Sequence, residues 1–303
     1  MNAHPSSLLT ERADSPRRAR AAGLRGWIAR HPLAAFLVIA GSLGYSSMIA
    51  VVLAARGVVP GGSLPARLHI APDELAGGLL VWAGLVPATL IITSVTDGRD
   101  GIRQLVARML RWRVAFGWWL LVLAGLPVLT VGLSALLGDS LRPVDPVGFA
   151  LGQVTFLVVN LLATNVWEEA AWAGFLQTRW ERRHNLVVAS LLTAVVFAFG
   201  HLPLALFDGA MASSLAVSFL LYFVLGVLVR PMFALVLRGT GGSLLLVAVL
   251  HSVFNRTNND NGIAATLVPG EARVLAMLVA VVAVIAMAAV AVRWGGRRPA
   301  AAS

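Results

Sequence analysis

Five side chains in the middle of the chain are of the types that activate water. Glu168 and Glu169 are adjacent carboxylates, His201 follows them, and His251 and Asn255 come later. A carboxylate can take a proton from water, and an imidazole can orient that water. An imidazole or an amide can also stabilise the oxyanion that forms when water attacks a carbonyl. The set therefore indicates hydrolysis.

Taken singly, each of these residues has a plain structural explanation. His201 alone predicts a packed imidazole, and His251 with Asn255, four positions apart, predicts an interhelical hydrogen-bonding pair. Glu168 and Glu169 diverge by about 100° around a helix, so one can face a cavity while the other faces a neighbouring helix. Because ionisable groups within a membrane are costly, their convergence on successive apolar helices favours a functional site.

The elements that must position these residues are transmembrane helices. Of the 303 residues, 58% are hydrophobic and only 13% are charged, which excludes an ordinary soluble domain. Apolar runs near 20 residues recur along the chain and predict an all-α integral membrane bundle of about eight transmembrane helices. The expected spans are 33–55, 77–95, 114–137, 147 to beyond 169, 186–207, 213–237, 243–256 and 272–293, and 101–113 is expected to be an amphipathic interfacial helix.

The chain ends differ from this apolar body. Residues 1–32 are polar and rich in arginine and predict a disordered cytoplasmic tail. Residues 33–295 form the expected transmembrane domain, and 296–303 form a short basic tail. There is no cysteine, which excludes disulfides and thiolate chemistry.

The distribution of arginine predicts the orientation in the membrane. All 24 basic residues are arginine, and alternating spans from a cytoplasmic N-terminus place nineteen of them on the cytoplasmic side and five on the other. We therefore expect a multi-pass protein of the cell membrane with both termini in the cytoplasm. The net charge of +10 is then explained by an anionic leaflet, without nucleic acid. The absence of lysine suggests a GC-rich, bacterial coding bias.

The order of the motifs resembles the CAAX-protease and bacteriocin-processing (CPBP) family, which includes the type 2 CAAX prenyl proteases. The family pattern is Glu-Glu-x-x-x-Arg, Phe-x-x-x-His and His-x-x-x-Asn on successive helices. The chain has Glu168-Glu169, then Phe197 to His201, then His251 to Asn255, and the stretch 239–244 matches the usual lead-in to the third motif. The resemblance covers about 147–255 and implies an intramembrane endopeptidase whose site opens toward the cytoplasm.

The resemblance also implies a role for each residue. Glu168 would be the general base on the attacking water, and His201 would share that water. His251 and Asn255 would hold the oxyanion, and Glu169 would be structural, paired with the arginine four residues later. That arginine is absent, because Ala173 occupies its position.

Three outcomes follow from Ala173. Glu169 could be protonated, another arginine could replace the missing one, or activity could be lost. Arg230, within an otherwise apolar span, is the candidate replacement. The simpler interpretation, which we favour, is that Arg230 snorkels to the cytoplasmic interface.

Alternatives to a glutamic protease also stay open. Glu168, His201 and His251 could bind a divalent metal such as zinc, although no His-Glu-x-x-His motif is present. A catalytically inactive scaffold or bacteriocin-immunity protein of the same fold is the second reading, supported by Ala173. A transporter with a Glu/His proton relay is a third, although it would predict inverted repeats that are not visible. The expected partners are the lipid bilayer and a membrane-associated peptide substrate, whose prenylation is doubtful in a bacterial protein.

Overall fold

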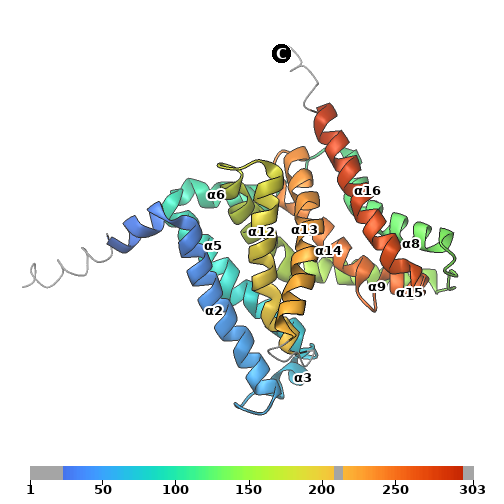
Figure 1. Cartoon of the computed structure of the whole chain (residues 1–303), viewed down its shortest axis with the longest axis horizontal. Coiled ribbons are helices and arrows are strands. Elements are labelled where there is room, and N and C mark those ends of the chain that lie inside the picture. The colour runs from blue at the N-terminus through green and yellow to red at the C-terminus, as the bar shows by residue number, and fades with distance from the viewer. Residues whose placement is uncertain (1–22, 208–213, 296–303) are drawn as a thin grey trace, which may run out of the picture.

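The computed structural model describes residues 23–207 and 214–295, and this part of the chain is helical and contains no strand (Figure 1). The tails predicted for 1–22 and 296–303 lie outside the described residues. The elements η2 to η5 are π-helical and η6 is a 3₁₀ turn. The elements are α2 (Pro32–Ala55), α3 (Leu64–Leu68), α4 (Pro72–Leu79), η2 (Leu80–Leu85), α5 (Val86–Thr96), α6 (Gly98–Met109), α7 (Phe116–Leu120), η3 (Leu121–Gly125), α8 (Leu126–Leu136), α9 (Pro146–Asn160), η4 (Leu161–Asn165), α10 (Val166–Glu169), η5 (Ala170–Gln177), α11 (Thr178–Trp180), α12 (Leu186–His201), η6 (Leu202–Leu206), α13 (Leu215–Gly239), α14 (Leu244–Asn258), α15 (Ile263–Leu267) and α16 (Ala272–Gly295).

Seven helical stretches of the described chain are long and apolar enough to cross a membrane. They are Pro32–Ala55, Pro72–Thr96, Phe116–Leu136, Pro146–Trp180, Leu186–Leu206, Leu215–Gly239 and Ala272–Trp294. The remaining predicted span, 243–256, corresponds to α14, which has 15 residues and is buried on most of its surface. Because α14 packs against α8, α9, α10 and α13, it needs no lipid-facing length of its own. The all-α membrane bundle is therefore confirmed, with seven long spans and one short central helix.

One end of the bundle, which we call the arginine-rich end, contains 23–31, 97–115, 179–185, 238–243 and 293–295. The Arg111 guanidinium donates to the carbonyl of Gly241 at 2.7 Å, which joins the segment after α6 to the turn before α14. The Arg179 guanidinium donates to Asp97 at 2.6 Å, which joins the end of α11 to the start of α6. Figure 1 shows α6 lying across this end, as expected for an interfacial helix.

The other end of the bundle, which we call the mouth end, is made by 56–71, 138–146, 202–207, 214–215 and 258–272. Its contacts also link separate elements. The Arg56 guanidinium donates to the carbonyl of Leu206 at 2.9 Å, and the Arg142 amide donates to the carbonyl of Leu267 at 2.8 Å. Successive loops therefore alternate between the two ends of the bundle, as the predicted spans require.

Local sequence signals fix where several helices begin. Asp145 accepts hydrogen bonds from Val147 and Gly148 and caps α9, and Ser243 accepts from Leu246 and caps α14. Residues 23–30, which the sequence assigned to a disordered tail, are instead helical. The reason is that Ile28 is buried in the apolar cluster formed by α2, η2 and η5, which orders this segment.

Candidate active site

Glu168, His201 and Asn255 line one cavity of about 360 Å³. They come from α10, α12 and α14, three segments that are distant in the sequence. The cavity is also lined by Asn160 and Asn165 and by residues of α4 near the mouth end. Of the predicted set of Glu168, two histidines and Asn255, the cavity lining contains Glu168, His201 and Asn255 but not His251.

Two groups lie beside the Glu168 carboxylate. The indole Nε1 of Trp172 donates to Glu168 Oε1 at 2.9 Å, and the Nε2 atom of His201 lies 3.7 Å from the same oxygen. The latter distance is too long for a direct hydrogen bond. His201 Nδ1 lies 2.9 Å from the carbonyl of Phe197. Because a carbonyl can only accept, Nδ1 carries the proton, and in a neutral ring Nε2 is then an acceptor that faces Glu168.

The Asn255 amide is the candidate oxyanion donor. Within the described chain, no hydrogen bond occupies this side chain, and it lines the cavity together with Glu168. Asn165, by contrast, donates to Ser252 Oγ at 2.8 Å and so ties η4 to α14. Of the cavity amides, Asn255 is thus available to a substrate, whereas Asn165 has a structural partner.

Glu169 lies behind the cavity in a buried ion pair with Arg230. The two guanidinium nitrogens of Arg230 donate to the two carboxylate oxygens at 2.9 and 3.1 Å, which is bidentate geometry. Glu169 is 0% exposed and Arg230 is 2% exposed. The favoured expectation that Arg230 snorkels to the interface is therefore wrong. The alternative, in which Arg230 replaces the arginine missing at Ala173, is what the structure shows.

Two aromatic rings explain why this arginine remains inside the bundle. The Arg230 guanidinium carbon lies 4.8 Å from the ring centroids of both Phe197 and Phe233. Cation–π attraction and the bidentate carboxylate together offset the cost of burying the charge. The sequence offered Arg230 as a candidate partner for Glu169, 61 residues away, but the apolar span around Arg230 made an interfacial position the favoured expectation.

His251 contacts Glu169 and is not among the residues that line the cavity. Its Nδ1 atom lies 2.9 Å from Glu169 Oε1, but the angle is not that of a hydrogen bond, so the contact is chiefly electrostatic. The expected position of His251 as an oxyanion donor beside Asn255 is therefore not observed. Its ring instead packs 5.4 Å from Phe233, between centroids, within the layer that supports Glu169.

The arrangement does not fit the metal alternative. A site built from Glu168, His201 and His251 requires all three at one point, but the two histidines contact different carboxylates. Within the described residues, no three His, Asp or Glu side chains are grouped closely enough to hold a metal ion.

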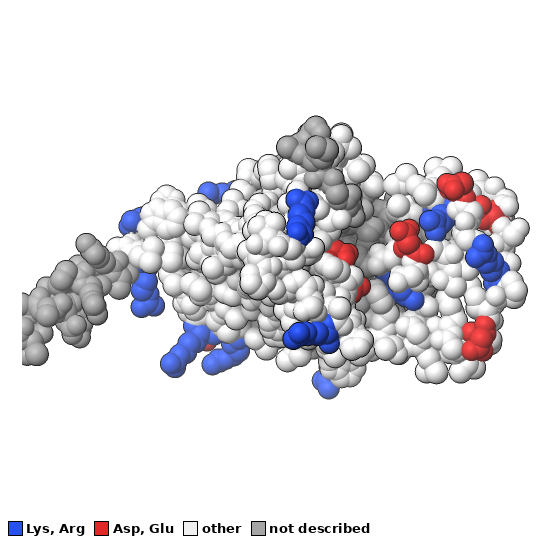
Figure 2. All heavy atoms as spheres, turned by 90° about the horizontal axis from the view of Figure 1, so that it is seen from below, with Lys and Arg blue, Asp and Glu red and all other residues white. Residues whose placement is uncertain are grey.

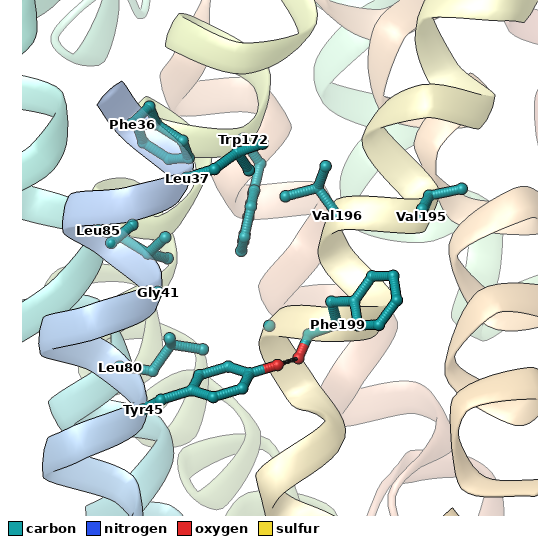
Figure 3. A pocket seen from close by; sticks show the side chains of 12 residues that line it. Phe36, Leu37, Gly41, Tyr45, Leu80, Leu85, Trp172, Val195, Val196 and Phe199 are labelled. Carbon is teal, nitrogen blue, oxygen red and sulfur yellow. Dashed lines mark hydrogen bonds between the residues drawn. The ribbon is translucent and has the colours of Figure 1, made fainter. Parts of the chain in front are cut away.

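Trp172 is the site residue that the sequence reasoning missed. It lies four positions after Glu168, and this spacing places two helical side chains on one face. On its other side, Trp172 lines a second, apolar cavity of about 380 Å³ between α2 and α12 (Figure 3). At the lower end of that cavity, the Tyr45 hydroxyl donates to the carbonyl of Phe199. Trp172 therefore separates an apolar cavity from the polar one.

Comparison with known proteins agrees with the motifs. Residues 150–257 match the family model of the type II CAAX prenyl endopeptidase Rce1-like proteins. Comparison with curated proteins and with solved structures gives no match. The matched segment contains Glu168, His201, Arg230 and Asn255, and so the whole polar cavity wall contributed by α10, α12 and α14. The match confirms the resemblance to the CAAX-protease and bacteriocin-processing family. Residues 150–257 are therefore an Rce1-like segment of a multi-pass membrane protein.

Proposed function

We propose that this protein is an intramembrane endopeptidase that hydrolyses a membrane-associated peptide with water activated by Glu168 and His201. The observation that carries the proposal is the shared cavity of Glu168, His201 and Asn255. A separate layer behind it, made by Glu169, Arg230 and His251, contains no group directed at this cavity.

The geometry suggests a role for each group. A water between Glu168 and His201 donates its two hydrogens to the carboxylate and to Nε2, so that an oxygen lone pair is left for the peptide carbonyl. The Glu168 carboxylate takes the proton as the carbon–oxygen bond forms, and then delivers it to the departing amine. The Asn255 amide donates to the oxyanion. Trp172 fixes the orientation of Glu168 through its indole N–H.

The layer around Glu169 acts by positioning. Glu168 and Glu169 are neighbours in α10, and the ion pair of Glu169 with Arg230 joins this short helix to α13. His251 joins the same carboxylate to α14. Because α10, α13 and α14 are tied to one buried carboxylate, the arrangement of the cavity wall depends on Glu169 and Arg230. This finding weakens the second candidate function, an inactive scaffold, whose chief support was Ala173.

We further propose that the protein lies in the cell membrane with both termini in the cytoplasm. The support is the clustering of arginine at one end of the bundle, where twelve of the described arginines lie. The motifs do not identify the substrate, which the experiment below is designed to find.

The test is cleavage of a panel of membrane-anchored peptides by the full-length protein in lipid. The wild type is compared with Glu168→Gln, which keeps the shape of the side chain but removes the base, and with Glu271→Gln as a matched control. Glu271 is exposed and lies in the segment before α16, away from the cavity lining. We expect cleavage by the wild type and by the control, loss in Glu168→Gln, and no effect of a chelator. Equal cleavage by Glu168→Gln would refute the proposed base, and loss with the chelator would refute the metal-free mechanism.

A further inference from the structure

The cavity lies toward the mouth end, away from the arginine-rich end. His201 is the last residue of α12, fifteen residues or about 23 Å from the start of this helix at the arginine-rich end. Asn255 lies eleven residues, about 17 Å, beyond Leu244 on α14. Glu168 precedes Trp180, at the arginine-rich end of its helix, by twelve residues, or about 18 Å. All three helices therefore place their site residues about 17–23 Å from the arginine-rich end.

The lining residues indicate where the cavity opens. Ile70, Glu74 and Asn259 contribute to its wall, and all three are exposed. Ile70 precedes α4, Glu74 lies in the first turn of α4, and Asn259 follows α14, so all three belong to the mouth end. Figure 2 views this end from below and shows a hollow beside acidic side chains between the main body and the part on the right. A peptide can therefore approach Glu168 from this end.

Tight packing separates Glu168 from the arginine-rich end. A Cβ atom added to Gly174 would lie 2.9 Å from Leu244 and 3.1 Å from Leu105, so η5 is in close contact with α14 and α6 there. Phe175 adds a stacked contact with Phe36, whose ring centroid is 4.9 Å away. A separate polar cavity of about 340 Å³ at the arginine-rich end touches Gly174 and Phe175, but it shares no lining residue with the cavity of Glu168. The cavity of Glu168 therefore has its mouth at the other end.

The charges of the two ends differ strongly. Among the described residues, twelve arginines and three acidic residues belong to the arginine-rich end, whereas five arginines and six acidic residues belong to the mouth end. Arg230, Glu168 and Glu169 are counted in neither group because they are buried in the bundle. Short loops rich in arginine stay in the cytoplasm, and acidic residues have little influence on this rule. The arginine-rich end is therefore the cytoplasmic one.

We infer that the catalytic cavity opens on the extracytoplasmic face, so that its substrate is a peptide segment presented from outside the cytoplasm. The resemblance to CAAX proteases implied the opposite opening, and that expectation cannot hold together with the arginine distribution. A cytosolic prenylated C-terminal tail is excluded as the substrate, and an exported or outward-facing membrane peptide is the fitting class. The substrate part rests on the proposed peptidase activity, whereas the direction of the opening does not.

The natural absence of cysteine allows the opening to be tested directly. Single cysteines are introduced into the full-length chain at Asn259, which lines the mouth, at Ser63, in an exposed mouth-end loop, and at His184, exposed at the arginine-rich end. Intact cells are treated with a membrane-impermeant maleimide before and after permeabilisation. We expect S63C and N259C to be labelled in intact cells, and H184C only after permeabilisation. S63C serves as a second probe in case N259C disturbs the cavity.

Any other pattern at Ser63 and His184 overturns the inference. A second arm compares right-side-out with inverted vesicles, using an impermeant peptide that the wild type cleaves in detergent. We expect faster cleavage by right-side-out vesicles, and faster cleavage by inverted vesicles would overturn the inference. If no peptide is cleaved in detergent, the proposed function fails, while the labelling still decides which face the cavity opens on.

Discussion

Replacing Arg230 with methionine keeps much of the side-chain volume but leaves Glu169 without the guanidinium that forms two hydrogen bonds with it. Both partners are almost completely buried. Breaking a buried ion pair by removing one partner leaves an uncompensated charge and costs about 3–5 kcal/mol. His251, 2.9 Å from Glu169, provides some compensation, so we expect a loss near 3 kcal/mol.

Glu169→Gln has a similar cost, because it leaves the Arg230 guanidinium buried against a neutral amide. The double variant Glu169→Gln with Arg230→Met removes both charges at once. We expect it to lose about as much stability as either single variant, which corresponds to a coupling free energy of about 3 kcal/mol. Non-additivity of this size is the signature of two residues that serve as each other's main partner.

The measurement is unfolding in mixed micelles, followed by the fluorescence of the nine tryptophans. The control cycle uses Arg238→Met and Glu181→Gln, an ion pair of 3.3 Å at the arginine-rich end whose arginine is 50% exposed. An exposed pair of this kind contributes about 0–1 kcal/mol, so its coupling should be small. If the Arg230 and Glu169 effects add to within about 0.5 kcal/mol, the proposed replacement of the motif arginine is refuted.

Three further predictions concern single positions. Trp172→Phe keeps the ring packing but removes the donor to Glu168, so kcat should fall about 10-fold while KM and stability change little, measured on a cleaved peptide and by unfolding. Asn255→Ala should lower kcat by about 10²–10³-fold, the usual cost of one oxyanion donor, and an unchanged kcat would remove Asn255 from the mechanism. Gly84→Val should lower the free energy of unfolding by about 1–3 kcal/mol, because a Cβ atom there would lie 2.9 Å from the Ala40 carbonyl oxygen of α2. A stable Gly84→Val protein would show that α2 and η2 do not pack as closely as described.

The positions of the spanning helices could be predicted from the sequence because the signal is local. A run of apolar residues long enough to cross a bilayer is present in the chain before any tertiary contact forms. The second span nevertheless begins at Pro72, five residues before the predicted start, where Glu74 accepts a hydrogen bond from the Ala71 amide. Hydropathy alone assigned the acidic residues of that first turn to a loop, although acidic residues favour the N-terminus of a helix.

The π-helical turns could not be predicted in the same way. η4 and η5 flank Glu168 and Glu169, and such turns are often found at functional sites. Their formation depends on how the segment 161–177 packs against α12 and α14, which no pattern of residue types encodes. The identity of the site residues was predicted because their types and order are unusual within apolar helices, whereas the contact of His251 with Glu169 required the structure.

The exchange of the motif arginine illustrates how far a sequence pattern can be relied on. A motif such as Glu-Glu-x-x-x-Arg records one local way of placing a positive charge on the second carboxylate. The physical requirement is the charge beside Glu169, and Arg230 meets it from another helix with bidentate geometry. Ala173, 2% exposed, then fills the former position with a small apolar side chain that packs in the core. Because the requirement is met in space, the substitution at Ala173 is no argument against activity, and the coupling between Arg230 and Glu169 is the quantity that decides the question.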